Sequence, residues 1–472
     1  MKKEAVPPTE EQKLETARKV SIKEGACSSA MDGFGLRYIT PYALALGATN
    51  AQIALLSSLP SLIGNVSQLG TLKLIQKFPR KKIVLWGVAI QALMWIPLIL
   101  IGWLYFFNGL STLKASLLVI ALYTAIVIAG ASVSPAWSSW MKDILASKNG
   151  GYFSNRNKII TGVVLISMLV GGSVLDYFQD TNVFLGFAVI FSLAFLGRAI
   201  AVYYFTKQYE PEHKYNAKSA FTLVNFIEHL TQNNFGRFAI FVSIVSLATS
   251  VAGPFFAVYM LKELNLDYLS YTLIILSPVV STFVFLPVWG KFSDIHGNVK
   301  ILKITGYLIP FIPLLWMFSA VLIPLGRAEL VFYLFVLEIF SGFAWAGFNQ
   351  GSAMFIFDAV SKDKMPYCIA YFNILTGIGI FIGAMFGGYI ASFRAYPFGL
   401  TATFATFLVS GLLRLIAVAL FLPWIKEVKP VAPFSVKQSI KSRFKEDKAM
   451  LTTQFWRLVG FKPLRPHQPT TH

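Results

Sequence analysis

Residues 143–172 read DILASKNGGYFSNRNKIITGVVLISMLVGG, and residues 358–387 read DAVSKDKMPYCIAYFNILTGIGIFIGAMFG. Both stretches begin where a long apolar run ends, pass through a short polar turn and enter a Gly-rich apolar run. Identical residues recur 215 positions apart, namely Asp143/Asp358, Tyr152/Tyr367, Thr161/Thr376, Gly162/Gly377 and Gly172/Gly387. Two parallel repeats in a membrane protein allow two similar bundles to rock about a site at their interface. The repeat therefore predicts a protein that moves a solute across a membrane.

The composition is that of an integral membrane protein. Of the 472 residues, 56% are hydrophobic and only 13% are charged, whereas a soluble domain carries about 25% charged residues. Apolar runs of about 20 residues, long enough to cross the hydrocarbon core as helices, recur along the chain. We predict an all-α fold of twelve transmembrane helices in two pseudo-symmetric six-helix bundles. The predicted spans are 24–47, 51–76, 82–106, 114–142, 157–178, 183–206, 237–261, 269–291, 301–323, 330–357, 367–392 and 400–424.

The net charge of +19 is explained by topology. Alternating the twelve spans places 34 of the 41 Lys and Arg residues in the tails and in the loops on one side, and four in the loops on the other. The positive-inside rule then predicts that both termini are cytoplasmic and that the protein lies in the plasma membrane. Basic segments also attract anionic lipid. We therefore expect membrane lipid, and no nucleic acid, as a partner.

The polar segments divide the chain into five parts. We expect a cytoplasmic tail over residues 1–20, bundles over 21–206 and 237–425, a cytoplasmic linker over 207–236 and a basic cytoplasmic tail over 426–472. In the linker, an apolar stripe at helical spacing predicts either a short amphipathic helix on the membrane surface or a simple solvated connection. The C-terminal tail suits a helix on anionic lipid or a disordered segment.

The sequence does not indicate a metal site, a cofactor or an enzymatic site. No histidine lies in a predicted span, and Cys27 and Cys368 suit small buried side chains better than a disulfide in a reducing compartment. We therefore expect no metal and no cofactor. Because no phosphate-binding Gly-rich loop or nucleophile motif is present, we expect neither ATP hydrolysis nor an enzyme. Uphill movement of a solute would then draw on an ion or solute gradient.

The segment after the eighth span reads Gly290-Lys-Phe-Ser-Asp294-Ile-His-Gly297-Asn-Val-Lys300. It resembles the loop signature of the major facilitator superfamily, in which Gly is followed by Asp four residues on, then Gly and basic residues. In that superfamily the loop latches the cytoplasmic side while the outer side is open. A matching loop is expected after the second span, where Gly70 aligns with Gly290 and Arg80 with Lys300. The Asp position there holds Leu74, so the resemblance implies an asymmetric latch.

The repeated carboxylates provide a second gating element. Asp143 and Asp358 each close a long apolar span, and Arg156 begins the fifth span. An anion beside helix N-termini with a cation near it predicts a cytoplasmic salt-bridge network. The alternative is a pair of ordinary interfacial carboxylates.

Charges within predicted spans are the main candidates for a transport site, because they are costly in a membrane and usually face a cavity. These are Asp32 and Arg37 in the first span and Glu338 in the tenth. Asp32 is the expected proton or substrate site, and Arg37 a counter-charge or anion ligand. Since five residues are roughly 140° around a helix, the two need not pair with each other. The alternative role is a structural ion pair between helices.

Several uncharged polar or aromatic side chains in the first, tenth and eleventh spans are weaker candidates for the transport site. They are Tyr38 beside Arg37, Trp345, Asn349 and Gln350 along the tenth span, and Asn373 in the eleventh. Each can line a cavity, although packing is the alternative for Trp345, and polar side chains in membrane helices also bridge helices.

The preferred interpretation is a secondary transporter that resembles the major facilitator superfamily and moves a small-molecule substrate by alternating access. We favour proton coupling, with sodium coupling and uncoupled movement left open, and we expect a monomer. The rival is a protein of the same fold that handles lipid or acts as a receptor. A lipid-handling protein would have a laterally open cavity lined by Phe and Leu.

Overall fold

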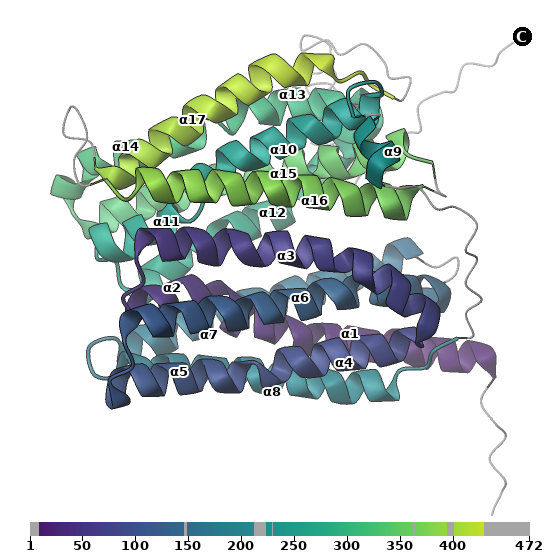
Figure 1. Cartoon of the computed structure of the whole chain (residues 1–472), viewed down its shortest axis with the longest axis horizontal. Coiled ribbons are helices and arrows are strands. Elements are labelled where there is room, and N and C mark those ends of the chain that lie inside the picture. The colour runs from purple at the N-terminus through teal and green to yellow at the C-terminus, as the bar shows by residue number, and fades with distance from the viewer. Residues whose placement is uncertain are drawn as a thin grey trace, which may run out of the picture.

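The computed structural model describes residues 9–145, 149–211, 223–228, 230–361, 364–393 and 401–428, which form helices and no strand. The helices fall into two halves (Figure 1). The first half contains α1 (Glu10–Phe34), η1 (Leu36–Tyr38), α2 (Ile39–Ala45), α3 (Asn50–Lys77), α4 (Arg80–Leu93), α5 (Trp95–Asn108), α6 (Thr112–Leu145), α7 (Asn149–Phe178) and α8 (Val183–Lys207). The second contains α10 (Asn234–Ala252), α11 (Phe255–Val258), η2 (Tyr259–Glu263), α12 (Tyr268–His296), α13 (Asn298–Leu308), α14 (Phe311–Leu322), η3 (Ile323–Leu325), α15 (Arg327–Ala359), α16 (Met365–Ile390), α17 (Ala402–Phe421) and η5 (Leu422–Trp424). The short helix α9 (Leu223–Glu228) lies between the halves in sequence.

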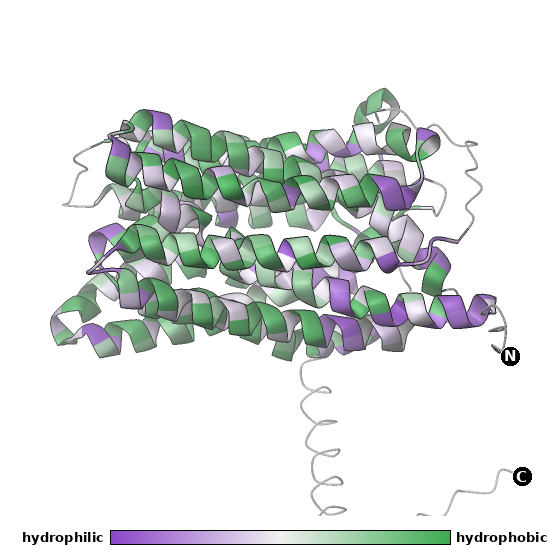
Figure 2. Ribbon diagram, turned by 90° about the horizontal axis from the view of Figure 1, so that it is seen from below, coloured by the Kyte–Doolittle hydropathy of each residue, from purple (hydrophilic) through white to green (hydrophobic). Residues whose placement is uncertain are grey.

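Ten helical segments in the described residues are long and apolar enough to cross a membrane. The other two predicted spans correspond to the end of α1 with η1 and α2, and to α3, which run alongside the ten (Figure 1). They are more polar because α1 carries Glu24 and Asp32, and α3 carries Asn65 and Gln68. The predicted all-α architecture of two six-helix halves is confirmed. Figure 2 shows hydrophobic residues along the helices and hydrophilic residues gathered toward their ends.

The same end of the bundle holds the start of α1, the end of α8, the start of α10 and the end of α17 (Figure 1). We call this the tail end, and the opposite end the far end. At the tail end, α1 begins at Glu10, capped by Thr9 and Gln12, so the first helix extends through residues expected to be a tail. Residues 429–472, which include most of the predicted C-terminal tail, lie outside the described part.

Helix interruptions repeat between the halves. The first span of each half breaks at a glycine, Gly35 between α1 and η1 and Gly253 between α10 and α11, where Pro254 follows. The third span breaks at Met94 in the first half and at Ile309, 215 residues later, in the second. The repeat seen in the sequence thus extends to where the backbone turns.

Among the described residues, α11 touches α2 and α3 across the boundary between the halves, but the main contacts there are those of α3 with α16 and of α7 with α12. Their backbones approach closely where glycine lies at the contact. A Cβ added at Gly172 of α7 would lie 2.3 Å from Thr272 Oγ1 of α12, and one added at Gly388 of α16 would lie 2.8 Å from Ala54 Cβ of α3. Gly172 is one of the repeated residues, so part of the repeat serves the contact between the halves.

The linker helix is short. α9 covers Leu223–Glu228, and residues 212–222 and 229 lie outside the described part. Phe226 is buried and packs on Tyr371 and Phe235, with ring centroids 5.5 and 6.2 Å away, whereas Val224 and Ile227 are exposed. The predicted apolar stripe therefore does not act as one surface. Phe226 packs on the second half, whereas Val224 and Ile227 remain exposed.

Candidate functional site

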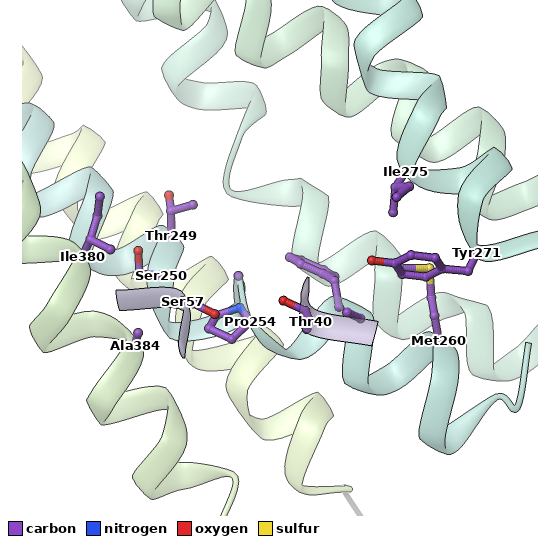
Figure 3. A pocket seen from close by; sticks show the side chains of 13 residues that line it. Thr40, Ser57, Thr249, Ser250, Pro254, Met260, Tyr271, Ile275, Ile380 and Ala384 are labelled. Atoms are coloured by element: carbon purple, nitrogen blue, oxygen red, sulfur yellow. The ribbon is translucent and has the colours of Figure 1, made fainter. Parts of the chain in front are cut away.

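A cavity of about 330 Å³ lies between the two halves. Its walls come from α2, α3, α10, α11, η2, α12 and α16, so both halves contribute. The wall is mostly apolar but carries five hydroxyl groups, from Thr40, Ser57, Thr249, Ser250 and Tyr271. In Figure 3 the hydroxyl ends of Tyr271 and Thr40 point toward the middle of the view. No charged side chain of the described residues lines this cavity.

The break in the seventh span shapes one wall of the cavity. Gly253 and Pro254 both line it, at the point where α10 ends and α11 begins. Thr249 lies in the last turn of α10, and its Oγ1 is buried with no hydrogen-bond partner among the described residues. An interrupted helix at a site between two halves is a recurrent feature of transporters, because it exposes polar groups at membrane depth. Thr249 therefore belongs to the cavity wall, while its hydroxyl oxygen is buried there without a partner in the described part of the chain.

Asp32 and Arg37 lie beside this cavity rather than in its wall. Arg37 interacts electrostatically with Tyr271, a cavity residue, and with Tyr123 of α6. The two charges form an ion pair, with Arg37 Nη2 3.4 Å from Asp32 Oδ2. On one continuous helix the two need not have paired, but α1 ends at Phe34 and the 3-10 turn that follows changes the angle between them. Their side chains are 34% and 41% exposed, so they face open space.

Tyr38 does not line the cavity. It is fully buried, donates to Met168 O of α7 and shares a hydrogen bond with Thr272 Oγ1 of α12 at 3.0 Å. It therefore ties three spans together across the boundary between the halves.

Glu338 lies away from Asp32, in the second half. Its Oε1 accepts a hydrogen bond from Trp316 Nε1 at 2.8 Å, and Arg414 is its charged neighbour. Arg414 is 1% exposed and donates to Ile309 O and Thr249 O. The structure thus places Glu338 in a buried network that reaches the cavity helix α10 through Arg414, and it does not form one site with Asp32.

Of the remaining polar candidates, Asn373 makes hydrogen bonds between helices. Asn373 O accepts from Asn65 Nδ2 of α3 at 2.8 Å, and Asn373 Nδ2 donates to Gln68 Oε1 at 3.3 Å, so Asn373 joins the halves. Trp345 packs edge-on against Phe348. Asn349 is exposed, and Gln350 points toward Gly290, whose added Cβ would lie 3.9 Å from Gln350 Nε2.

Sequence reasoning missed a buried charge cluster in the first half. Glu24 of α1 is 2% exposed, and its Oε1 accepts from Arg156 Nη2 at 2.9 Å, Trp137 Nε1 at 3.3 Å and Ser21 Oγ at 3.2 Å. The Arg156 guanidinium also lies 4.6 Å from the centre of the Trp137 ring. Arg156, expected to act with Asp143, instead holds the start of α7 to α1.

Two buried arginines were also missed, although the sequence held a signal for them. Arg198 of α8 and Arg414 of α17 are 216 residues apart, close to the repeat spacing, and both are buried. Arg198 donates to Ser28 Oγ at 2.6 Å and to Gln91 Oε1. Each arginine joins the last span of its half to the first span and to the third, at Gln91 in one half and at Ile309 O in the other.

At the tail end, Asp143 binds the first residue of α4. Arg80 Nη1 lies 2.6 Å from Asp143 Oδ2, and Arg80 Nε lies 3.4 Å from Glu210 Oε1. Arg80 is 2% exposed and also donates to Ser139 O and Pro211 O.

The second half repeats this arrangement, with the neutral amide of Asn298 in place of the Arg80 guanidinium. Asn298, the first residue of α13, donates to Asp358 Oδ2 at 2.7 Å, and Glu427 Oε2 accepts from Val299 N at 2.8 Å. The structural counterpart of Arg80 is therefore Asn298 and not Lys300, because Arg80 follows Gly70 by ten residues whereas Asn298 follows Gly290 by eight. Arg80 and Asn298 each bind the repeated carboxylate at the first residue of a helix.

The acidic residue of the latch loop, unlike Asn298 and Val299, faces outward in this conformation. Asp294 is exposed, and no hydrogen bond or ion pair of its carboxylate is recorded within the described residues. Gly297 has a φ of 85°, in the region that favours glycine, and turns the chain between α12 and α13. A Cβ added at Gly70 would meet nothing within 4 Å, so the close packing that Gly70 and Gly290 permit is absent here.

Hydrogen bonds join the two halves at the far end. Three hydrogen bonds cross between the halves there, from Lys262 Nζ to Ala48 O at 2.8 Å, from Asn50 Nδ2 to Ala391 O at 2.9 Å and from Leu269 N to Asp176 Oδ1 at 3.4 Å. Toward the tail end, the glycines Gly70 of α3 and Gly162 of α7 face open space. The halves are thus held together at the far end and, further along α3 and α16, through the hydrogen bonds of Asn373 with Asn65 and Gln68.

Comparison with known proteins places the chain in one family. The model of the major facilitator superfamily matches residues 25–244 and 238–464, which together cover most of the chain. No curated protein gives a significant sequence match.

Solved structures show the same fold at low sequence identity. The nucleoside transporter NupG, in a mutant form, aligns with a TM-score of 0.66 and 15% identity over 88% of this chain and 100% of that one. A bacterial homologue of the iron transporter ferroportin, in an inward-facing state, aligns with a TM-score of 0.59 and 13% identity over 88% and 99%. A bacterial homologue of the human lysosomal transporter Spinster, inward-facing and unoccupied, aligns with a TM-score of 0.57 and 14% identity over 89% and 98%.

Proposed function

The chain belongs to the major facilitator superfamily and is a membrane transporter, and we propose that it moves a small, uncharged, hydroxyl-bearing solute by alternating access. The observation that carries this proposal is the cavity of about 330 Å³ whose wall is shared by the two halves. A site at the interface of two repeats opens to either side of the membrane when the repeats rock.

The chemistry of the cavity supports an uncharged substrate. Hydroxyl groups such as those of Ser57, Ser250 and Tyr271 can donate or accept hydrogen bonds. An ionised ligand would be costly in an apolar wall that supplies no counter-charge. The volume suits a ligand at the small end of the usual range of about 300–1,000 Å³. A wall with hydroxyls also favours a polar solute over the lipid-handling alternative, for which we expected Phe and Leu.

We propose that movement is coupled to protons through Asp32. The positive charge of its partner Arg37 acts on Tyr271, which lines the cavity. A change in the charge of Asp32 would therefore alter the electrostatics of the substrate site. Protonation of Asp32 removes its charge and weakens the pair, which gives the two protonation states different preferences for the conformations of the transporter. The positive-inside rule supports a plasma-membrane orientation with the tail end in the cytoplasm.

A ligand screen tests the substrate class. Purified protein is melted with uncharged hydroxylated solutes, beginning with nucleosides because NupG is a nucleoside transporter, and with charged analogues of similar size. A ligand that binds only the folded state raises the melting temperature by mass action. We expect shifts with uncharged compounds only, and uptake of the same compounds into proteoliposomes.

The control separates the cavity from other binding surfaces. Ser57→Ala and Tyr271→Phe remove one hydroxyl each from the cavity wall, whereas Ser192→Ala removes one from an exposed position on α8. The first two should reduce the shift and the uptake, and the third should not. Charged compounds that alone raise the melting temperature would overturn the proposed substrate class.

A further inference from the structure

A second pocket, of about 390 Å³, opens at the tail end of the second half. It lies between the start of α10 and the end of α17, which are far apart in sequence. Its lining is basic and apolar and consists of Thr231, Arg237, Ile240, Pro423, Trp424 and Lys426. No carboxylate of the described residues lines it, so two positive charges face the pocket without a counter-charge in its wall.

The backbone around both cations is fixed. Asn234 Nδ2 donates to Lys426 O at 2.7 Å, and Lys426 N donates to Asn234 Oδ1 at 2.9 Å, so the segment after α17 is bound to the first residue of α10. Arg237 donates through Nε to Thr231 O at 3.1 Å. Its two terminal nitrogens have no recorded partner within the described residues. A guanidinium anchored at Nε with free terminal nitrogens is suited to bind two oxygens of one phosphate.

The carboxylate nearest in sequence is already engaged. Glu427 follows Lys426, but its Oε2 accepts from Val299 N at 2.8 Å and its Oε1 from Val428 N at 3.0 Å. The pocket also lies within the first turns of α10, where the helix dipole favours an anion. Both observations indicate that the missing partner is an anion from outside the chain.

We propose that this pocket binds the phosphate of an anionic phospholipid, held between Arg237 and Lys426. The apolar part of the lining identifies lipid as the source of the phosphate. Trp424 is 54% exposed at the end of a membrane-spanning helix, the level at which tryptophan favours the membrane interface. Ile240 and Pro423 continue the apolar surface toward the hydrocarbon core. Basic pockets between helices on the cytoplasmic side are suited to lipid head groups.

Lipid-dependent stability tests the proposal without measuring transport. Full-length protein is melted in detergent containing phosphatidylglycerol or phosphatidylcholine. We expect phosphatidylglycerol alone to raise the melting temperature. In Arg237→Gln and in Lys426→Gln, the same rise should need about fivefold more lipid for each cation removed. Lys303→Gln removes an exposed positive charge from the tail end of α13, outside the pocket, and should behave as wild type.

Two further arms make the result decisive. Inorganic phosphate and glycerol 3-phosphate supply an anionic phosphate without acyl chains, so a rise of equal size with either would overturn the lipid assignment in favour of a soluble phosphate. Native mass spectrometry counts retained phosphatidylglycerol even where a variant is less stable. Equal retention by wild type, Arg237→Gln and Lys426→Gln would also overturn the proposal. Loss of retention in these two variants, and not in Lys303→Gln, would support it.

Discussion

Buried charges in this transporter are satisfied within single halves. Glu24 forms an ion pair with Arg156 between α1 and α7, and Glu338 accepts a hydrogen bond from Trp316 between α15 and α14, so each carboxylate joins helices of one six-helix half. Removing one member of a buried pair leaves the other charged and without a partner, which is far more costly than losing an exposed pair. These residues therefore make each half rigid, which rocking as a unit requires.

The cluster around Glu24 provides a stability prediction. Glu24→Gln keeps the shape of the side chain but leaves Arg156 buried without its counter-charge, so it should lower the free energy of unfolding by about 3–5 kcal/mol. Lys19→Gln is the control, because Lys19 forms a 2.9 Å pair with Glu15 while both side chains are more than half exposed. It should change stability by less than about 0.5 kcal/mol. Thermal unfolding measures both, and equal effects would show that the cluster does not stabilise the first half.

The pair of Asp32 and Arg37 provides a coupling prediction. Asp32→Asn removes the carboxylate proposed to carry the proton, so uphill accumulation driven by a pH gradient should be lost while solute exchange continues. Because the pair is partly exposed, stability should fall by no more than about 1 kcal/mol. Accumulation and exchange are compared in proteoliposomes with and without an imposed pH gradient. Equal losses in both modes would assign Asp32 a structural role.

The sequence drew attention to the charged pair beside the cavity, but not to the cavity wall. Asp32 and Arg37 were identifiable because charge inside an apolar run is costly. Thr40, Ser57 and Thr249 carry no such signal, since hydroxyl side chains in membrane helices usually bond to their own backbone. Only the convergence of several helices from two halves distinguishes them. The sequence left the pairing of Asp32 with Arg37 open, because the end of the helix between them could not be seen in it.

At the scale of elements, α16 packs on α10 through a row of glycines. Added Cβ atoms at Gly379, Gly383 and Gly387 would lie 2.5, 2.0 and 2.1 Å from carbonyl oxygens of α10. Backbones in such close contact gain dispersion energy that larger residues would prevent. The spacing of four residues was visible in the sequence, whereas the helix that it faces was not.

This row predicts a stability difference between two glycines. Gly383→Ala places a methyl group against Leu247 O, and should lower the free energy of unfolding by about 1–3 kcal/mol because α16 must shift. Gly162→Ala is the matched change in α7, where an added Cβ meets nothing within 4 Å. It should be neutral or stabilising by up to about 1 kcal/mol. Thermal melting of the two variants compares them, and a tolerated Gly383→Ala would mean that the two helices can separate freely.

The loop between α12 and α13 provides a prediction about kinetics. Asp294 is exposed in the present conformation, so Asp294→Asn should change stability by less than about 0.5 kcal/mol. If the loop latches the tail end in the opposite conformation, the same variant should slow transport. Leu74→Met, at the matching position of the first half, should have little effect on either quantity. Turnover in proteoliposomes is the deciding measurement, and an unchanged rate for Asp294→Asn would exclude a gating role.

At the scale of the whole molecule, the fold was predictable because it depends on patterns that repeat along the chain. The apolar runs predicted the membrane spans, and the repeat that relates Asp143 to Asp358 predicted the two halves. The first span was the hardest to place, since α1 begins at Glu10 and carries buried charge. The conformation was not predictable, because it is set by contacts between halves such as those of Asn50 with Ala391 and Lys262 with Ala48.

These far-end contacts lead to a prediction about alternating access. If the halves rock, the bond between Asn50 and Ala391 must break in every cycle so that the cavity can open at the far end. After replacement of Cys27 and Cys368, cysteines at 50 and 391 joined by a short, reducible thiol cross-linker should reduce transport at least tenfold, and reduction should restore it.

The matched control joins cysteines at 267 and 327. Asp267 and Arg327 form a 2.5 Å ion pair at the same end but within the second half. Burial raises the pKa of Asp267, but hydrogen bonds from Ser270 and the charge of Arg327 outweigh it and hold this pKa below its ordinary value. The carboxylate is therefore ionised and paired at neutral pH, and the pair need not separate when a half moves as a unit.

Cross-linking cysteines at 267 and 327 should therefore leave transport intact. Transport at the full rate with residues 50 and 391 joined would refute rocking of the halves, whereas a loss in both cross-linked proteins would mean that the halves are not rigid.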